Sequence, residues 1–190
     1  MDQFGYVVGL LSIITGLALS DLGFSLHRLL RRRHEVRWDP LVLATAAYFA
    51  FTVVRYWYQV WSIREMAGVT SLFFFLGLLI ENFLLFLIVA SALPDADDLK
   101  PGAIDLRAFQ RENSRYLWTL FLLYSVMWGA HGFYFGFTLN GYVSPRLAEV
   151  FIAPVVLSAG LALSRRRWLQ VALFAVLVIH EASWIVISGY

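Results

Sequence analysis

Residues 69–93 read VTSLFFFLGLLIENFLLFLIVASAL, and this stretch decides the fold class of the chain. Apart from Glu81 and Asn82, it is almost entirely apolar. It is also longer than the ~20 residues that an α-helix needs to cross ~30 Å of hydrocarbon. The whole chain is 190 residues long and 60% hydrophobic, whereas water-soluble domains average roughly 45–50%. The sequence therefore predicts an all-α, polytopic membrane protein in which residues 1–190 form a single transmembrane domain.

Five further apolar stretches accompany this one, so we expect a six-transmembrane-helix bundle. The fifth stretch is the weakest span, because it is short and Pro154 interrupts it. A re-entrant segment is the alternative there. The expected helices are Phe4–Leu30, Pro40–Ser62, Val69–Leu93, Tyr116–Leu139, Ala148–Ser164 and Trp168–Gly189.

The distribution of basic residues predicts the topology. Loops on the cytoplasmic side of a membrane carry an excess of Lys and Arg. The second and fourth loops offer only Arg64 and Arg146. The odd loops are far richer, so we expect them inside and both termini outside. Their basic residues are Arg28, Arg31, Arg32, Arg33 and Arg37 in the first, Lys100, Arg107, Arg111 and Arg115 in the third, and Arg165, Arg166 and Arg167 in the fifth.

The loop around residues 94–115 is the one sizeable segment outside the expected spans. Asp105 is suited to cap a short helix that carries Leu106 and Phe109 and leads into the fourth span. We expect this helix to lie on the inner leaflet. The acidic patch before it is interpreted as a solvated loop; its residues are Asp95, Asp97 and Asp98.

Small residues form a stripe along the first and the fourth spans. Such residues let two helix backbones approach closely in lipid. We expect these two helices to pair, either within one protomer or across a homodimer seam. The glycines concerned are Gly5, Gly9, Gly16 and Gly23 in the first span and Gly129, Gly132 and Gly136 in the fourth.

Polar residues within the expected spans mark a candidate site. Each is costly in hydrocarbon and is expected to face a protein interior or a water-filled cavity. A rise of ~1.5 Å per residue places most of them near the bilayer midplane, with Asp21 closer to the inside. They form either a structural network or the lining of a path. The residues are Asp21, Arg55, Glu81, Asn82, His131, His180 and Glu181.

Two of these residues permit a redox alternative. His131 and His180 lie on different spans at comparable expected depth, and a pair of imidazoles can hold a haem iron from opposite faces. In that case His131 and His180 would bind haem b. Otherwise no cofactor is expected, and the pattern predicts no metal site.

Several function classes lack any signal. The chain has no cysteine, which excludes disulfides and thiolate metal sites. It has no nucleophile elbow, zinc-binding helix motif or phosphate-binding glycine loop, so an enzyme is not favoured. Glu81 and Glu181 acting as an acid–base pair on a lipid stays open. The net charge of +2 arises from arginines at span ends and indicates orientation, with no nucleic-acid partner.

Three patches together carry a family resemblance. They are residues 12–20 (SIITGLALS) with the arginines that follow, residues 55–61 (RYWYQVW), and residues 105–109 (DLRAF) with Glu112, Asn113 and Arg115. They resemble a family of short, uncharacterised multi-pass inner-membrane proteins of proteobacteria. The resemblance implies the bacterial inner membrane as the location and carries no activity.

The function expected from these patterns is transport. The convergence of ionisable groups at one depth favours a small transport or channel-type protein that conducts protons or small ions. The haem-binding redox subunit is one alternative. The other is a structural or accessory subunit of a larger membrane complex, for which the small-residue stripes supply the helix-packing surface. Besides lipid, the expected partners are a second copy of the chain or such a complex.

Overall fold

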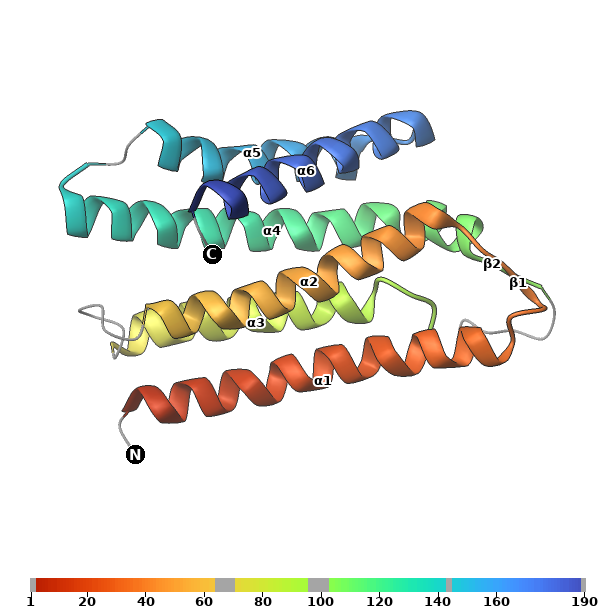
Figure 1. Ribbon diagram of the computed structural model, residues 1–190, viewed down its shortest axis with the longest axis horizontal. Coiled ribbons are helices and arrows are strands. Elements are labelled where there is room, and N and C mark those ends of the chain that lie inside the picture. Colours follow the sequence, from red (N-terminus) through yellow and green to blue (C-terminus); the bar gives the residue numbers. More distant parts are fainter. Residues whose placement is uncertain (1–2, 64–70, 96–102, 143–144, 189–190) are drawn as a thin grey trace. The chain divides into compact units, whose positions relative to one another are not determined.

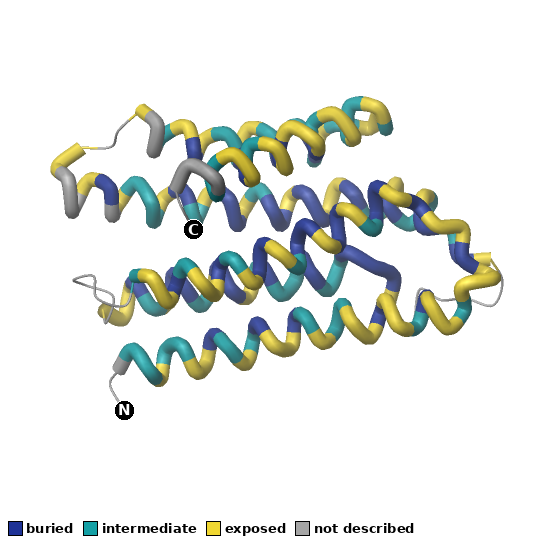
Figure 2. The backbone as a smooth tube through the Cα atoms, in the orientation of Figure 1, coloured by how far each residue is buried: buried dark blue, intermediate teal, exposed yellow. Residues whose placement is uncertain are grey.

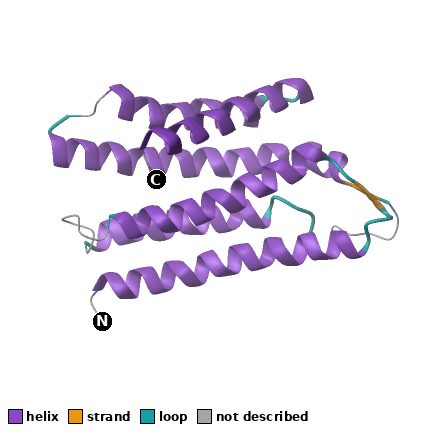
Figure 3. Cartoon of the chain, viewed as in Figure 1, coloured by secondary structure: helices purple, strands orange, loops and turns teal. Residues whose placement is uncertain are grey.

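The computed structural model describes residues 3–63, 71–95, 103–142 and 145–188, and these residues are predominantly helical (Figures 1 and 3). They form two compact units, residues 1–112 and 113–190, each of which is described by itself. The elements in chain order are α1 (Gln3–Arg31), β1 (Val36–Arg37), α2 (Pro40–Ser62), α3 (Leu72–Ala90), β2 (Ile104–Asp105), α4 (Leu106–Asn140), α5 (Pro145–Leu163) and α6 (Arg167–Ser188).

Four of the helices are long and apolar enough to cross a membrane. These segments are Phe4–Arg31, Pro40–Ser62, Leu72–Ala90 and Arg167–Ile185. The predicted all-α fold is confirmed, and the length and composition of these four helices support a membrane protein. In α5 the apolar segment Ala148–Leu163 is shorter, and Pro154 lies inside this helix without ending it.

The helices α2 and α3 begin where the sequence supplies a cap. Asp39 precedes Pro40, and its Oδ1 accepts hydrogen bonds from the backbone N–H groups of Leu41 at 2.9 Å and Val42 at 3.4 Å. Pro40 needs no such partner, because it has no N–H and its fixed φ suits the first helical turn. Ser71 caps α3 in the same way through the N–H of Phe74. The Asp39 cap explains why α2 begins at the predicted residue.

A two-stranded parallel sheet closes one end of the first unit, and the sequence analysis did not predict it. Val36 pairs with Ile104 and Arg37 with Asp105 (Figure 3). The N–H of Ile104 donates to the carbonyl of Glu35 at 2.9 Å, and Arg37 Nη1 lies 3.8 Å from Asp105 Oδ2. The segments after α1 and before α4 therefore meet at one end, as expected for two loops on the same side of a membrane.

The separate interfacial helix is a point of difference from our expectation. Asp105 does cap a helix, since its Oδ1 accepts from the N–H groups of Arg107 at 2.9 Å and Ala108 at 3.1 Å. This helix is continuous with α4, which runs unbroken from Leu106 to Asn140. The physical reason is that no proline or glycine occurs between Leu106 and Trp128. Of the acidic patch, Asp97 and Asp98 lie outside the described residues.

The buried residues follow the inner faces of the helices (Figure 2). In the first unit, Leu11, Phe49 and Leu85 are at most 1% exposed and represent α1, α2 and α3. In the second unit, Trp118 of α4 contacts Phe174 of α6, with ring centroids 6.1 Å apart. Gln170 Nε2 of α6 also donates to Ser114 Oγ of α4 at 2.9 Å. An aromatic pair and a hydrogen bond thus join α4 to α6.

Candidate functional site

Asn82 connects α3 to α1 at the centre of the first unit. Its Nδ2 donates to the carbonyl oxygen of Leu11 at 2.8 Å, and its Oδ1 accepts from Thr15 Oγ1 at 3.3 Å. Asn82 is 1% exposed, and Leu11 and Thr15 are also buried. Leu11 and Thr15 lie four residues apart, on one face of α1. One side chain therefore spans a full turn of the neighbouring helix.

Glu81 precedes Asn82 and lies at the middle of the 19-residue helix α3. It is 1% exposed, which makes it one of the most deeply buried side chains in the described structure. A carboxyl at this position is remote from both ends of a membrane-spanning helix. Because a charged group costs roughly 2.5–3.5 kcal/mol at the centre of such a helix, Glu81 is a candidate functional residue.

Arg55 lies near the same level on α2. The hydroxyl of Tyr56, the next residue, donates to the carbonyl of Leu78 at 2.7 Å and so joins α2 to α3. Glu81 follows Leu78 by less than one turn. Arg55 and Glu81 are therefore both within about 5 Å, measured along the helix axes, of one contact between their helices. The Nε and Nη1 atoms of Arg55 are shielded from solvent.

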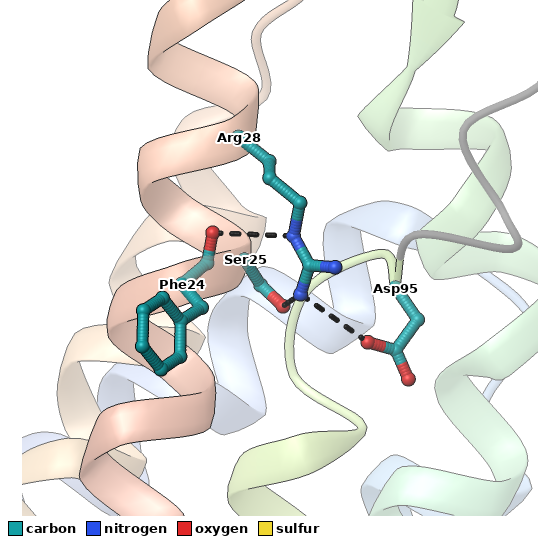
Figure 4. A network of polar contacts seen from close by, with 4 residues as sticks. All are labelled: Phe24, Ser25, Arg28 and Asp95. Carbon is teal, nitrogen blue, oxygen red and sulfur yellow. Dashed lines mark hydrogen bonds and ion pairs between the residues drawn. The ribbon is translucent and has the colours of Figure 1, made fainter.

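Asp21 lies on α1 nearer the end that carries the arginines, and it is partly exposed. Two turns further along, Arg28 binds the end of α1 to the segment after α3 (Figure 4). Its Nε donates to the carbonyl of Phe24 and its Nη2 to Ser25 Oγ, both at 3.3 Å, and Nη2 lies 3.7 Å from Asp95 Oδ1. This cluster connects one aspartate of the acidic patch to the end of α1.

The other three predicted site residues lie in the second unit. Glu181 of α6 is 6% exposed, whereas His131 and His180 are partly exposed. The contacts Ser114–Gln170 and Trp118–Phe174 share the same offset along the chain, so α4 and α6 run parallel. Extending this register places His180 level with Tyr124 and Glu181 level with Ser125.

The same register bears on the haem alternative. His131 lies roughly 10 Å further along the axis of α4 than the level of His180. The two imidazoles are therefore at different heights in their helices, although the sequence alone had suggested comparable depth. Within the described residues, no group of three His, Asp or Glu side chains is placed to hold a metal ion.

The glycines of the fourth span pack against an aromatic ring of α5. A Cβ atom added at Gly129 would lie 3.6 Å from the Cβ of Phe151, and one added at Gly132 would overlap the ring of Phe151. Trp128 and Phe133 flank that ring, with centroids 4.8 and 5.6 Å from it. By contrast, a Cβ at Gly9, Gly16 or Gly23 would meet no atom within 4 Å in the described structure. The predicted pairing of the two stripes stays a prediction.

Sequence reasoning missed the partners of the central residues. Thr15 and the carbonyl of Leu11 carry no charge and gave no signal as isolated positions. The same holds for Ser12, whose Oγ accepts from Trp57 Nε1 of α2 at 2.9 Å. A usable signal existed in α1, because Thr15 lies on the face opposite to the exposed Gly16 and Leu17 and together with Leu11 and Ala18.

Comparisons with known proteins add no relative. The chain matches no family model, and neither a curated protein nor a solved structure is significantly similar to it.

Proposed function

We propose that this protein is a transport or channel-type protein of the bacterial inner membrane that moves protons, with Glu81 as the group that binds and releases them. The proposal includes a topology of six spans with both termini outside. The observation that carries it is the burial of a carboxyl group at the centre of a membrane-spanning helix. Carboxylates in such positions are the usual components of proton relays.

The neighbours of Glu81 support the proposal. Asn82 holds α3 against α1 through two hydrogen bonds, and Tyr56 holds α3 against α2 through a third. These bonds hold Glu81 at one depth. Arg55, at the same level on α2, supplies a permanent positive charge. A carboxyl held at a fixed depth inside a membrane-spanning helix is a group that a proton relay can use.

The test is proton flux into liposomes that contain the purified protein. A pH-sensitive dye is trapped inside, the membrane potential is clamped with potassium and valinomycin, and a pH step is applied. Wild-type protein is expected to dissipate the gradient faster than empty liposomes do. Glu81→Gln, which keeps the shape and removes the titrating group, is expected to return the rate to that of empty liposomes.

Glu112→Gln is the matched control, because Glu112 is exposed on α4 and the change removes the same charge. Its flux should equal that of the wild type. Both variants are compared with the wild type by gel filtration and thermal melting before reconstitution. The proposal is wrong if the wild type dissipates no gradient, or if Glu81→Gln is folded and conducts normally.

The alternatives of a haem-binding redox subunit and of a structural subunit stay predictions from sequence. A visible absorbance spectrum of the protein purified from its own membrane, before and after dithionite, tests the first. Co-purification from native membranes tests the second.

A further inference from the structure

Three exposed arginines of the first unit gather where the small sheet meets the start of α4. We call them the arginine cluster, and they are Arg37 of β1 and Arg107 and Arg111 of α4. Arg37 pairs with Asp105 in the parallel sheet, and Arg107 follows Asp105 by two residues. The sheet that brings the two segments together lies at one end of the unit (Figure 1).

The carboxylate of Asp105 links the two segments that carry the arginine cluster. Its Oδ1 accepts from the backbone N–H of Arg107 at 2.9 Å, and its Oδ2 lies 3.8 Å from Arg37 Nη1. The guanidinium of Arg37 therefore lies beside the first turn of α4. The Cα–Cβ bonds of a helix tilt toward its N-terminus. Arg107 and Arg111, four residues apart on one face, thus both project from α4 toward the end at which Arg37 lies.

The arginine cluster carries more positive charge than its contacts offset. The side chain of Arg37 is 77% exposed, and its contact with Asp105 is long for an ion pair. Within the described part of the chain, no acidic side chain forms an ion pair with Arg107 or Arg111. Three permanent positive charges therefore share one carboxylate at an exposed surface.

Two other acidic residues near the arginine cluster are directed elsewhere. Glu35 precedes β1, but its Oε2 accepts from Arg32 Nε at 3.0 Å. Glu112 is exposed on α4, and the helical rotation per residue places it about 140° around the helix from Arg107. Neither carboxylate lies on the face that Arg107 and Arg111 share, so this face is open to an anion from outside the chain.

The arginine cluster lies at the level of a membrane surface. The candidate spans Phe4–Arg31 and Pro40–Ser62 end and begin on either side of β1. Trp38, adjacent to Arg37, is 38% exposed, and tryptophan is enriched at the level of the lipid headgroups. The basic residues predict that this surface is the cytoplasmic one, whose anionic phospholipids attract basic segments. Lipid phosphates are therefore the anions nearest to the cluster.

We propose that the arginine cluster binds the phosphate group of an anionic phospholipid of the inner leaflet. A guanidinium presents a planar fork of N–H donors that matches two phosphate oxygens. The sheet and the Asp105 cap hold the backbone of all three arginines in place, which reduces the ordering that binding requires. A zwitterionic phospholipid offers the same phosphate together with a cation, which the excess positive charge repels. The site does not depend on the proposed transport of protons.

Native mass spectrometry of the full-length protein in detergent measures the binding of single lipid molecules. The protein is freed of bound lipid and titrated with phosphatidylglycerol, which is anionic, or with phosphatidylcholine of the same acyl chains, which is zwitterionic. The double variant Arg107→Gln/Arg111→Gln removes two arginines of the cluster and leaves Asp105 and the sheet in place. Arg165→Gln/Arg166→Gln is the matched control, because it removes the same charge from two exposed arginines between α5 and α6.

The wild type is expected to bind phosphatidylglycerol at least about tenfold more tightly than phosphatidylcholine. Arg107→Gln/Arg111→Gln should lose most of this preference, and the control should keep it. Arg107→Lys/Arg111→Lys keeps the charge without the planar fork, so it should lose part of the preference. Equal affinity of the wild type for the two lipids would overturn the proposal. Equal losses in the two glutamine variants would also overturn it, since total charge alone would then attract the lipid.

Glycerol phosphate, the soluble headgroup without acyl chains, separates a lipid site from a site for a free phosphate ester. At a concentration equal to that of phosphatidylglycerol it should displace no lipid, and displacement would overturn the assignment to lipid. The outcome is also separable from that of the flux assay. A lipid preference that depends on Arg107 and Arg111 in a protein without proton flux would retain this site and remove the proposed function. Flux that depends on Glu81 in a protein without the preference would do the reverse.

Discussion

The side-chain amide of Asn82 donates to the backbone carbonyl of Leu11 at 2.8 Å, across the interface between α3 and α1. The backbone bond of Leu11 within its own helix does not depend on Asn82, so this carbonyl serves two donors. Such an arrangement lets a membrane helix gain an interhelical hydrogen bond without breaking its own backbone hydrogen bonds. It also places Glu81 beside a bond that fixes the rotation of α3.

Asn82→Leu is expected to destabilise the fold by about 1 kcal/mol, the scale of interhelical hydrogen bonds in membranes. The loss is moderate because Leu has a similar volume and leaves no polar group of its own buried. Unfolding in a mild detergent titrated with SDS measures it. Phe83→Leu is the control, since Phe83 is exposed on the same helix. Equal stability of the two variants would show that the Asn82 bonds contribute nothing.

Gly132→Ala is expected to destabilise the second unit by about 1–3 kcal/mol, because its methyl group would overlap the ring of Phe151 in a packed core. Trp128 and Phe133 restrict the movement of that ring. Gly16→Ala should be close to neutral, since nothing lies within 4 Å of the added carbon. The melting temperatures of the two variants and of the wild type in detergent measure the difference.

A substitution at Phe151 tests the contact between Gly132 and Phe151 from the α5 side. Phe151→Leu removes the ring edge and should recover part of the stability that Gly132→Ala loses. The double variant should therefore be more stable than the sum of the two single losses predicts. Strict additivity would mean that Gly132 and Phe151 do not interact, and the packing of α5 on α4 would need another explanation.

Asp105 combines two roles that substitutions can separate. It caps α4 through its Oδ1 and lies 3.8 Å from the exposed Arg37 through its Oδ2. Asp105→Asn keeps a good cap and removes only a solvent-exposed ion pair, so the expected loss of stability is below about 1 kcal/mol. Asp105→Ala removes the cap as well and should cost about 1 kcal/mol more. Chemical denaturation with each variant measures the difference, and equal losses would assign the effect to the ion pair.

The sequence predicts the helices well where two independent signals coincide. For α2, the apolar stretch and the Pro40 start place both ends where the structure has them. For α4, hydrophobicity alone placed the start at Tyr116, ten residues after Leu106, because the first turns are polar. Their helical state depends on Asp105 and on the absence of breakers, which a hydrophobicity criterion does not include.

The remaining differences arise from contacts that one-dimensional patterns do not contain. Two residues on each strand are too few for any periodicity, so the pairing of Val36 with Ile104 left no trace in the sequence. In the candidate site, burial of Glu81 and Asn82 follows from their position in an apolar helix. The partners of Asn82 depend on helix rotation, which only the fold supplies.

The number of spans can be decided at one residue, Glu149. In a six-span topology, α5 begins on the outer side and Glu149, exposed in its second turn, lies near that surface. If only the four long apolar helices cross the membrane, then α4 and α5 stay on the inner side, and so does Glu149.

We expect Glu149→Cys to react with a membrane-impermeant maleimide added to bacterial cells that are made permeable only at the outer membrane. Arg33→Cys and Arg165→Cys, both exposed and on the expected inner side, should react only after the inner membrane is opened. Labelling of Glu149→Cys solely under that second condition would establish four spans and would place α4 and α5 on the inner side of the membrane.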